Sequence, residues 1–394
     1  MTYFRKGFGL KREIEGDLAA YHSTLVSSIR EQDYTLVVGD LTIRLAGEFG
    51  FCYGVDRAVE YAYETRRKFP DRQLFLVGEI IHNPHVNDRL TGLGITIIGY
   101  APNGEFDFSA IGEDDVVLMP AFGLSVTSFQ TLRSIGCVVV DTTCGSVLNV
   151  WKRVTRYAKD GFTSLVHGKH YHEETKATVS QATQFEGGTY LIVLDMQEAE
   201  IVCRFIERRD NLEEMEATFR HKVSVGFDFE RDLERIGVAN QTTMLANESL
   251  AIAKRVGESL ERRYGADNIN EHFRSFDTIC SATQERQDAV LDLIDEPLDT
   301  MIVIGGYNSS NTNNLARICA KSVTTYHIAG ARCIEPDSGR ILFKPVDSKE
   351  ETALENWLEG VNRIGMTAGA STPNNKIGEA IERILETKGL TLPA

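Results

Sequence analysis

No run of about eighteen apolar residues occurs in this 394-residue chain, so the sequence predicts no membrane-spanning helix. Basic residues are outnumbered, 42 against 57 acidic ones, and the formal charge of −15 argues against a nucleic-acid-binding protein. The first forty residues have neither the apolar core of a secretory signal nor the acid-poor composition of a transit peptide. The seven cysteines are odd in number and have no short spacings, which excludes an ordinary disulfide framework and favours a reducing cytoplasm.

Apolar stretches of strand length alternate with helical patterns along most of the chain. This alternation predicts an α/β fold with parallel sheets, whose functional loops gather at the carboxyl ends of the strands. The expected strands are 35–38, 73–77, 95–98, 116–119, 163–166, 189–194, 236–240, 301–304, 324–328 and 363–366. Pro373 is expected to be the first residue of the final helix.

Three cysteines divide the chain into similar units. Each one directly follows a stretch read as leading from a strand (41–51, 137–143 and 276–279) and precedes a helical pattern. The expected parts are an N-terminal extension and three α/β domains: residues 1–47, 48–143, 144–278 and 279–394. The strongly charged stretch at about 197–234 suggests an exposed helical insert in the second domain.

Cys52, Cys144 and Cys280 are the cysteines in this setting. Unpaired backbone N–H groups and the helix dipole favour a thiolate near a helix N-terminus, so three such residues could converge on one metal centre. Cysteine is also among the most buried residue types, and spacing alone leaves both interpretations open. For the remaining four cysteines, which lie in apolar runs or on helical faces, we expect ordinary burial: Cys137, Cys203, Cys319 and Cys333.

Several polar residues also follow expected strands. His172 and Glu174 could hold a phosphate and move a proton, or could simply form a solvated helix start. His82 could likewise be a ligand or an exposed loop residue. The stretch 308–311 (Asn-Ser-Ser-Asn) and the stretch 369–371 (Gly-Ala-Ser) suit either an anion site at a helix N-terminus or an ordinary N-cap.

Taken together, these motifs resemble one family, the 4-hydroxy-3-methylbut-2-enyl diphosphate (HMBPP) reductases, also called IspH or LytB proteins. The resemblance is closest to the long form of plants and cyanobacteria and covers roughly residues 48–385. The matching motifs start at Gly50 (GFCYGVDRA), Ile81 (IHN), Asp141 (DTTC), His172 (HEE), Gln241 (QTT), Ile279 (ICSAT), Asn308 (NSSN) and Thr367 (TAGAS).

The resemblance implies three α/β domains in a pseudo-threefold arrangement around a central 4Fe–4S cluster held by Cys52, Cys144 and Cys280. It implies that Glu174 delivers protons and that Thr242 positions the substrate hydroxyl. The residues that it assigns to the diphosphate are His82, His172, Ser309, Ser310, Asn311 and Ser371.

The implied reaction removes the hydroxyl of HMBPP with two electrons and two protons, giving isopentenyl and dimethylallyl diphosphates. Ferredoxin or flavodoxin is the implied electron donor, and the basic group Arg66-Arg67-Lys68 with Arg72 is a candidate docking patch. A cluster-dependent hydro-lyase and a non-catalytic iron–sulfur sensor are the alternatives.

Two residues depart from the family pattern. Phe122 stands where shorter members have a diphosphate-binding histidine, which puts one contact in doubt. Gly145 stands where a proline is more usual after the second cysteine, and we expect a looser turn there.

Overall fold

The computed structural model describes residues 1–392, which form two compact units. Each unit is assembled from segments that are far apart in the sequence. Among the described residues, the first unit comprises 1–6, 72–78 and 96–280, and the second comprises 7–71, 79–95 and 281–392.

The first unit contains a five-stranded sheet in the order β1-β7-β6-β4-β5. The printed pairings of β1 with β7, β7 with β6 and β6 with β4 are parallel. Each residue of β4, β6 and β7 is buried, as expected for a parallel sheet with both faces covered. Helix α5 (Val126–Ile135) contributes Leu132 to the core on one face. The strands are β1 (Thr2–Phe4), β4 (Leu74–Val77), β5 (Ile95–Ile98), β6 (Val116–Met119) and β7 (Val138–Asp141).

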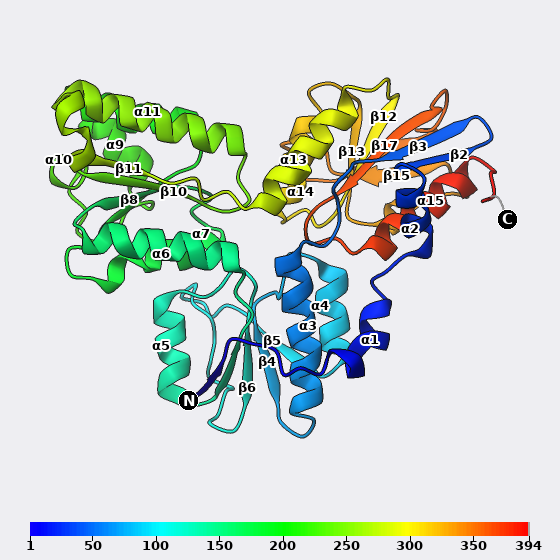
Figure 1. Ribbon diagram of the computed structural model, residues 1–394, viewed down its shortest axis with the longest axis horizontal. Coiled ribbons are helices and arrows are strands. Elements are labelled where there is room, and N and C mark those ends of the chain that lie inside the picture. Colours follow the sequence, from blue (N-terminus) through cyan, green and yellow to red (C-terminus); the bar gives the residue numbers. More distant parts are fainter. Residues whose placement is uncertain (393–394) are drawn as a thin grey trace. The chain divides into compact units, whose positions relative to one another are not determined.

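The second sheet of this unit has the order β11-β10-β8-β9, with all strands parallel. Helices α6 and α7 pack on one face, and α8 and α11 pack on the other (Figure 1). The strands are β8 (Thr163–His167), β9 (Tyr190–Val193), β10 (Ile236–Asn240) and β11 (Phe273–Ser275). The covering helices are α6 (Gly145–Lys159), α7 (Glu173–Ser180), α8 (Met196–Arg208) and α11 (Ala246–Tyr264), and α12 (Ile269–His272) precedes β11.

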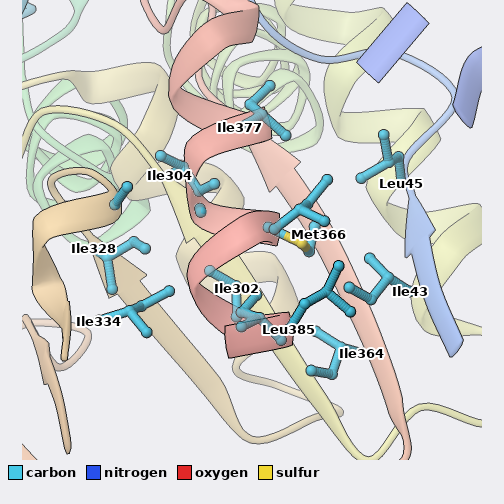
Figure 2. Packing of buried hydrophobic residues seen from close by; sticks show 14 of the residues in the cluster. Ile43, Leu45, Ile302, Ile304, Ile328, Ile334, Ile364, Met366, Ile377 and Leu385 are labelled. Carbon is cyan, nitrogen blue, oxygen red and sulfur yellow. The ribbon is translucent and has the colours of Figure 1, made fainter. Parts of the chain in front are cut away.

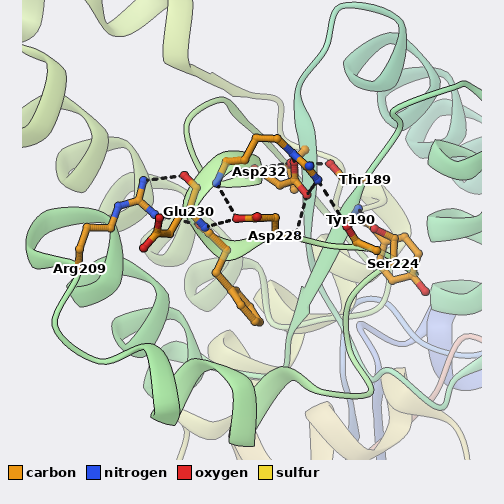
Figure 3. Close-up of polar contacts among 11 residues, drawn as sticks. Thr189, Tyr190, Arg209, Ser224, Asp228, Glu230 and Asp232 are labelled. Atoms are coloured by element: carbon orange, nitrogen blue, oxygen red, sulfur yellow. Dashed lines mark hydrogen bonds and ion pairs between the residues drawn. The ribbon is translucent and has the colours of Figure 1, made fainter.

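The charged stretch at about 197–234 is helical, as predicted, but one side of it is core. It contains most of α8, with α9 (Leu212–Phe219) and α10 (Phe229–Asp232). Phe205 and Phe219 are almost fully buried against the second sheet. Arg209, the C-cap residue of α8, donates to the carbonyl oxygens of residues 229 and 230 at 2.9 and 3.0 Å, which ties the end of α8 to α10 (Figure 3).

The second unit is built on a sheet of order β13-β12-β17-β3-β2, parallel except for the β2–β3 hairpin. Isoleucine and leucine side chains of these strands interlock with those of α15, including Ile377 and Leu385 (Figure 2). The strands are β2 (Thr35–Val38), β3 (Leu41–Leu45), β12 (Thr300–Ile304), β13 (Thr325–Ile328) and β17 (Arg363–Ala368). The helices on its faces are α2 (Thr24–Glu31), α13 (Ser281–Ile294), α14 (Ser310–Cys319) and α15 (Asn374–Thr387).

The same unit holds further helices and a small antiparallel sheet of order β14-β15-β16. Helix α3 contacts both α1 and α4. These elements are α1 (Lys11–Ala19), α3 (Tyr53–Lys68), α4 (Pro84–Gly92), β14 (Ile334–Glu335), β15 (Arg340–Phe343) and β16 (Thr352–Glu355).

The N-terminal stretch, expected as an extension with one strand at 35–38, enters both units. The strand at 35–38 is confirmed as β2, β3 pairs with β17, and β1 pairs with β7. The prediction for Pro373 is wrong by one position, because this residue has extended backbone and is the N-cap of α15. No helix within residues 1–392 combines the length and the apolar character that crossing a membrane requires.

Candidate active site

The three cysteines of interest share one local geometry. Cys52 and Cys144 are the N-cap residues of α3 and α6, and Cys280 directly precedes α13. All three are partly exposed, whereas the other four cysteines are buried. The predicted position at the start of a helix is therefore confirmed for all three, and the preceding strands β3, β7 and β11 end at Leu45, Asp141 and Ser275.

The buried cysteines have the opposite environment. Burial raises the pKa of Cys203 to about 11 and that of Cys319 to about 12, and it also raises the pKa of Cys137. These thiols therefore stay protonated at neutral pH and serve as small apolar core residues.

The loop before Cys52 is held by a buried arginine that sequence reasoning missed. Gly50 has φ +78°, and its carbonyl oxygen accepts hydrogen bonds from Nε and Nη2 of Arg286 at 3.3 and 2.8 Å. Arg286 is 3% exposed and lies in the second turn of α13. The amide of Cys52 itself donates to the carbonyl of Ala370 at 3.2 Å, so backbone contacts fix where the thiol stands.

The turn at Cys144 depends on Asp141 and on the first residues of the chain. One oxygen of Asp141 accepts from the amide of Thr143 at 2.9 Å. The other oxygen accepts from the hydroxyl of Tyr3 and from Nε of Arg5 at 3.2 Å. Because β1 pairs with β7, the N-terminal stretch delivers both partners to the end of the strand that leads to Cys144.

Glu174 and Thr242 lie together in the first unit. The Glu174 side chain is 3% exposed, and its Oε1 accepts from the amide of Thr242 at 2.6 Å. The carbonyl oxygen of Thr242 accepts from the amide of Cys280 at 3.4 Å. A buried carboxylate, a threonine and a partly exposed cysteine are thus joined through one short backbone segment.

His172 is the N-cap of α7. Its Nδ1 accepts from the amide of Glu174 at 3.1 Å, so the ring proton belongs on Nε2. The ring of Phe122 meets the His172 imidazole edge to face, with centroids 6.2 Å apart. Phe122 therefore supports the imidazole by packing and cannot donate to a phosphate itself.

Gly145 is the first residue of α6 and is exposed. A Cβ built at this position meets no atom within 4 Å, so nothing in the fold excludes a Cβ here, and the first position of a helix is one that proline readily occupies.

Ser309, Ser310 and Asn311 form the N-terminus of α14 in the second unit. Ser309 is the N-cap, and the next two residues are 2% exposed. Oδ1 of Asn311 accepts from the amide of Ala370 at 2.9 Å, while its buried Nδ2 has no hydrogen-bond partner among residues 1–392. An unpaired buried donor at a helix N-terminus suits an anionic ligand.

His82 belongs to the same group. Its Nδ1 lies 2.7 Å from a carboxylate oxygen of Glu79, which also accepts from Asn308 at 2.9 Å. The hydroxyl of Ser371 donates to the carbonyl of His82 at 3.1 Å. Sequence reasoning missed Glu79, although an acidic residue three positions before a histidine was a visible signal.

Gly369 allows close packing between the strand that precedes Ser371 and the helix that begins at Ser310. A Cβ at Gly369 would lie 1.9 Å from Oγ1 of Thr312, so only glycine lets the end of β17 approach the first turn of α14. The contacts in each unit therefore bring together two sets of predicted residues. The set in the first unit is His172, Glu174, Thr242 and Cys280, and the set in the second is Cys52, His82, Ser309, Ser310, Asn311 and Ser371. Cys144 lies in the first unit as well, where its amide donates to the carbonyl of Ala121 at 2.8 Å.

Comparisons with known proteins agree on one family. The family model described as LytB protein matches residues 43–385. A 4-hydroxy-3-methylbut-2-enyl diphosphate reductase of Acaryochloris marina is 46% identical, covering 98% of this chain and 94% of that protein. The enzyme of the same name from Synechococcus sp. (strain RCC307) is 49% identical, covering 98% and 93%.

Solved structures confirm the expected fold class of α/β domains with parallel sheets. A structure of (E)-4-hydroxy-3-methyl-but-2-enyl diphosphate reductase, described as the terminal enzyme of the non-mevalonate pathway, covers 87% of this chain with a TM-score of 0.53 and 28% identity; 99% of that structure is covered. The reductase of Plasmodium falciparum covers 87% of both chains with a TM-score of 0.63, and at 20% identity it supports the fold alone. With its whole motif set in order and a family match over most of its length, this chain belongs to the LytB protein family.

Proposed function

We propose that this chain is a reductase that converts HMBPP into isopentenyl and dimethylallyl diphosphates, the last step of the non-mevalonate pathway. Each substrate molecule takes up two electrons and two protons, loses its hydroxyl and releases one water. The full-length match to enzymes of this name supports the activity. The observation on this chain that carries it is the buried Glu174 carboxylate, 2.6 Å from the Thr242 amide and joined through Thr242 to Cys280.

The donor set fits an iron–sulfur cluster. Cys52, Cys144 and Cys280 are partly exposed at helix starts, whereas burial keeps thiols such as Cys319 protonated. Three thiolates suit a 4Fe–4S cluster with one iron open to substrate, while four would close the site. When bound, the cluster would pass the two electrons from the external reductant to the substrate and would offer a Lewis-acidic iron.

The diphosphate is held by the residues that follow the strands. His82, whose Nδ1 lies 2.7 Å from a carboxylate oxygen of Glu79, and His172, whose Nδ1 accepts from the amide of Glu174, are held in place by these contacts and supply imidazoles to the diphosphate. The N-terminus of α14 adds Ser309, Ser310 and the unpaired amide nitrogen of Asn311, and Ser371 completes the set. Fixing the diphosphate fixes the hydroxyl at the other end of the substrate, and such positioning can be worth ~7–11 kcal/mol in favourable cases.

Glu174 donates the proton to the leaving hydroxyl, and Thr242 orients that hydroxyl. Because Oε1 already accepts from the Thr242 amide, the proton of the neutral acid is carried on Oε2.

The proposal also includes the division into three domains, 48–143, 144–278 and 279–394, arranged pseudo-threefold about the cluster. It further includes a cytoplasmic location and reduction by ferredoxin or flavodoxin.

The test is anaerobic reconstitution with iron and sulfide, followed by an assay of HMBPP consumption with reduced viologen. We expect consumption that depends on the reductant, with both diphosphate products formed. Turnover without reductant would indicate a hydro-lyase instead. Tight HMBPP binding with no turnover would indicate a sensor.

A further inference from the structure

One face of α6 is basic in an acidic protein. The helix carries Lys152, Arg153, Arg156 and Lys159 and no acidic residue, although the whole chain has a charge of −15. We call these four residues the α6 basic face. Lys152, Arg156 and Lys159 are exposed and follow one another at helical spacing (i, i+4, i+7), so they form one stripe on the surface of the first unit.

An exposed aromatic residue adjoins this face. Phe276 is 42% exposed, and the guanidinium of Arg153 lies 3.9 Å from the centre of its ring. Tyr157 of α6 stacks against the same ring, with the Tyr157 and Phe276 centroids 6.5 Å apart and an interplanar angle of 28°. An exposed aromatic ring beside an arginine is the composition of a protein-binding hot spot.

Both elements lead directly to proposed cluster ligands. Cys144 is the N-cap of α6, and Lys152 and Arg156 lie eight and twelve residues along the helix, about 12 and 18 Å at 1.5 Å per residue. Phe276 lies four residues before Cys280 in the segment that follows β11. A partner bound here would therefore stand close to two of the three proposed ligands.

Acidic groups only partly offset the positive charge. Asp160 accepts from Arg274 and lies 3.7 Å from Arg156, whose side chain is nevertheless 70% exposed. One carboxylate is thus shared by two arginines, so the α6 basic face keeps a net positive charge.

The patch at the end of α3 is less suitable for electron delivery. Arg67 lies fifteen residues from Cys52 along a continuous helix, about 23 Å at the same rise. Its guanidinium is also paired with Asp17 at 3.1 Å, and Arg66 donates to the carbonyl of Phe69. This patch, favoured by charge density in the sequence, stands at the far end of its helix from the thiol.

We infer that the α6 basic face, together with Phe276, is the docking surface for an acidic one-electron carrier protein that reduces this enzyme. The inference rests on the proposed function, because only a reductase needs such a donor. Two docking events supply the two electrons of one turnover. Charge complementarity draws an acidic carrier to this face against the negative field of the whole chain, and the effect on association weakens with salt.

The test compares two double charge reversals that change the net charge equally. One is K152E with R156E on α6, and the matched control is R67E with K68E on α3. The probe is a purified acidic [2Fe–2S] ferredoxin, assayed as reductant for HMBPP turnover and, in its oxidised form, by calorimetric binding. We expect the α6 variant to lose about tenfold or more in kcat/KM for ferredoxin at low salt, with a difference that shrinks as salt rises. The α3 variant should stay close to wild type, and K152Q with R156Q should fall between.

Turnover driven by reduced viologen should be unchanged in every variant, since it needs no docking. If both reversals slow the ferredoxin reaction equally, whole-molecule charge is responsible and the inference is overturned. Loss of viologen turnover in the α6 variant alone would overturn it as well, because the site itself would then be damaged. If wild-type protein shows no viologen turnover, the proposed function fails, and the binding measurement still decides whether ferredoxin docks on α6.

Discussion

Replacing Glu174 by glutamine separates proton delivery from binding. In the protein with Glu174, the Thr242 amide nitrogen lies 2.6 Å from a carboxylate oxygen. Glutamine keeps the shape of the side chain and one acceptor oxygen for this amide, but it has no acidic proton. We expect kcat to fall by ~10²–10⁴, the usual contribution of general acid catalysis. At 1.36 kcal/mol per factor of ten, this corresponds to ~3–5 kcal/mol of activation free energy.

The folded state should tolerate the change. A hydrogen bond to a charged acceptor is worth ~1.5–3 kcal/mol and a neutral one ~0.5–1.5, so Glu174→Gln should cost ~1 kcal/mol of the free energy of unfolding. Cysteine geometry and the diphosphate residues are untouched, so iron content and substrate affinity should stay near wild type. His172→Ala should behave differently, weakening substrate binding by the ~1.5–3 kcal/mol of a charge-assisted hydrogen bond.

Anaerobic single-turnover kinetics and HMBPP binding on both variants provide the assay. Glu173→Gln is the matched control, because the same substitution one residue earlier on α7 removes a carboxylate that accepts from Tyr100 at 2.9 Å. A near-normal single-turnover rate in Glu174→Gln would refute the reasoning and place the proton donor elsewhere. Equal losses in Glu173→Gln and Glu174→Gln would attribute the effect to the charge of the helix start.

Three further predictions concern the cluster, the diphosphate and stability. Serine in place of any of the three proposed cluster cysteines should abolish activity and deplete iron in anaerobic counts, whereas serine at the buried Cys319 should leave both intact; normal iron in all three variants would contradict the assignment. Glu79→Gln should raise the KM for HMBPP about tenfold with little change in kcat, because the carboxylate that orients His82 through Nδ1 would be lost and a charged partner is worth ~1.5–3 kcal/mol; a fall in kcat alone would show a different role. Burial lowers the pKa of His327 to about 4, below its unfolded value, so the unfolded state binds more protons than the folded state between these two pKa values. The free energy of unfolding must therefore fall as pH falls, and from pH 7.5 to 5 we expect a loss of ~2 kcal/mol in urea titrations. His327→Gln should show a flatter pH profile. Parallel profiles for the two proteins would show that His327 does not cause the loss.

The reach of sequence reasoning is clearest at the cysteines. An apolar run followed by a cysteine and a helical pattern is a local signal, and the starts of α3, α6 and α13 follow the three cysteines as predicted. The strand–helix alternation and the N-cap at Ser309 are local in the same sense. Each depends on residues within one or two helical turns, so the sequence alone was enough to predict them.

The charged stretch shows where local composition misleads. Its abundance of acidic and basic residues predicts exposure, yet Val202, Phe205, Met215 and Phe219 are buried against the second sheet. An amphipathic helix has two faces, and composition averaged over a segment records only the more numerous side chains.

The sequence by itself thus determined the class of fold, the helix starts that carry the cysteines and, through the whole motif set, the family. Only the tertiary structure decided which distant residues support them. The pairing of β1 with β7 brings Tyr3 to Asp141 across 138 positions, and Arg286 reaches the carbonyl of Gly50 across 236. Such contacts depend on the order of strands in a sheet, which is settled by how whole elements bury their apolar faces and which no short stretch of sequence encodes.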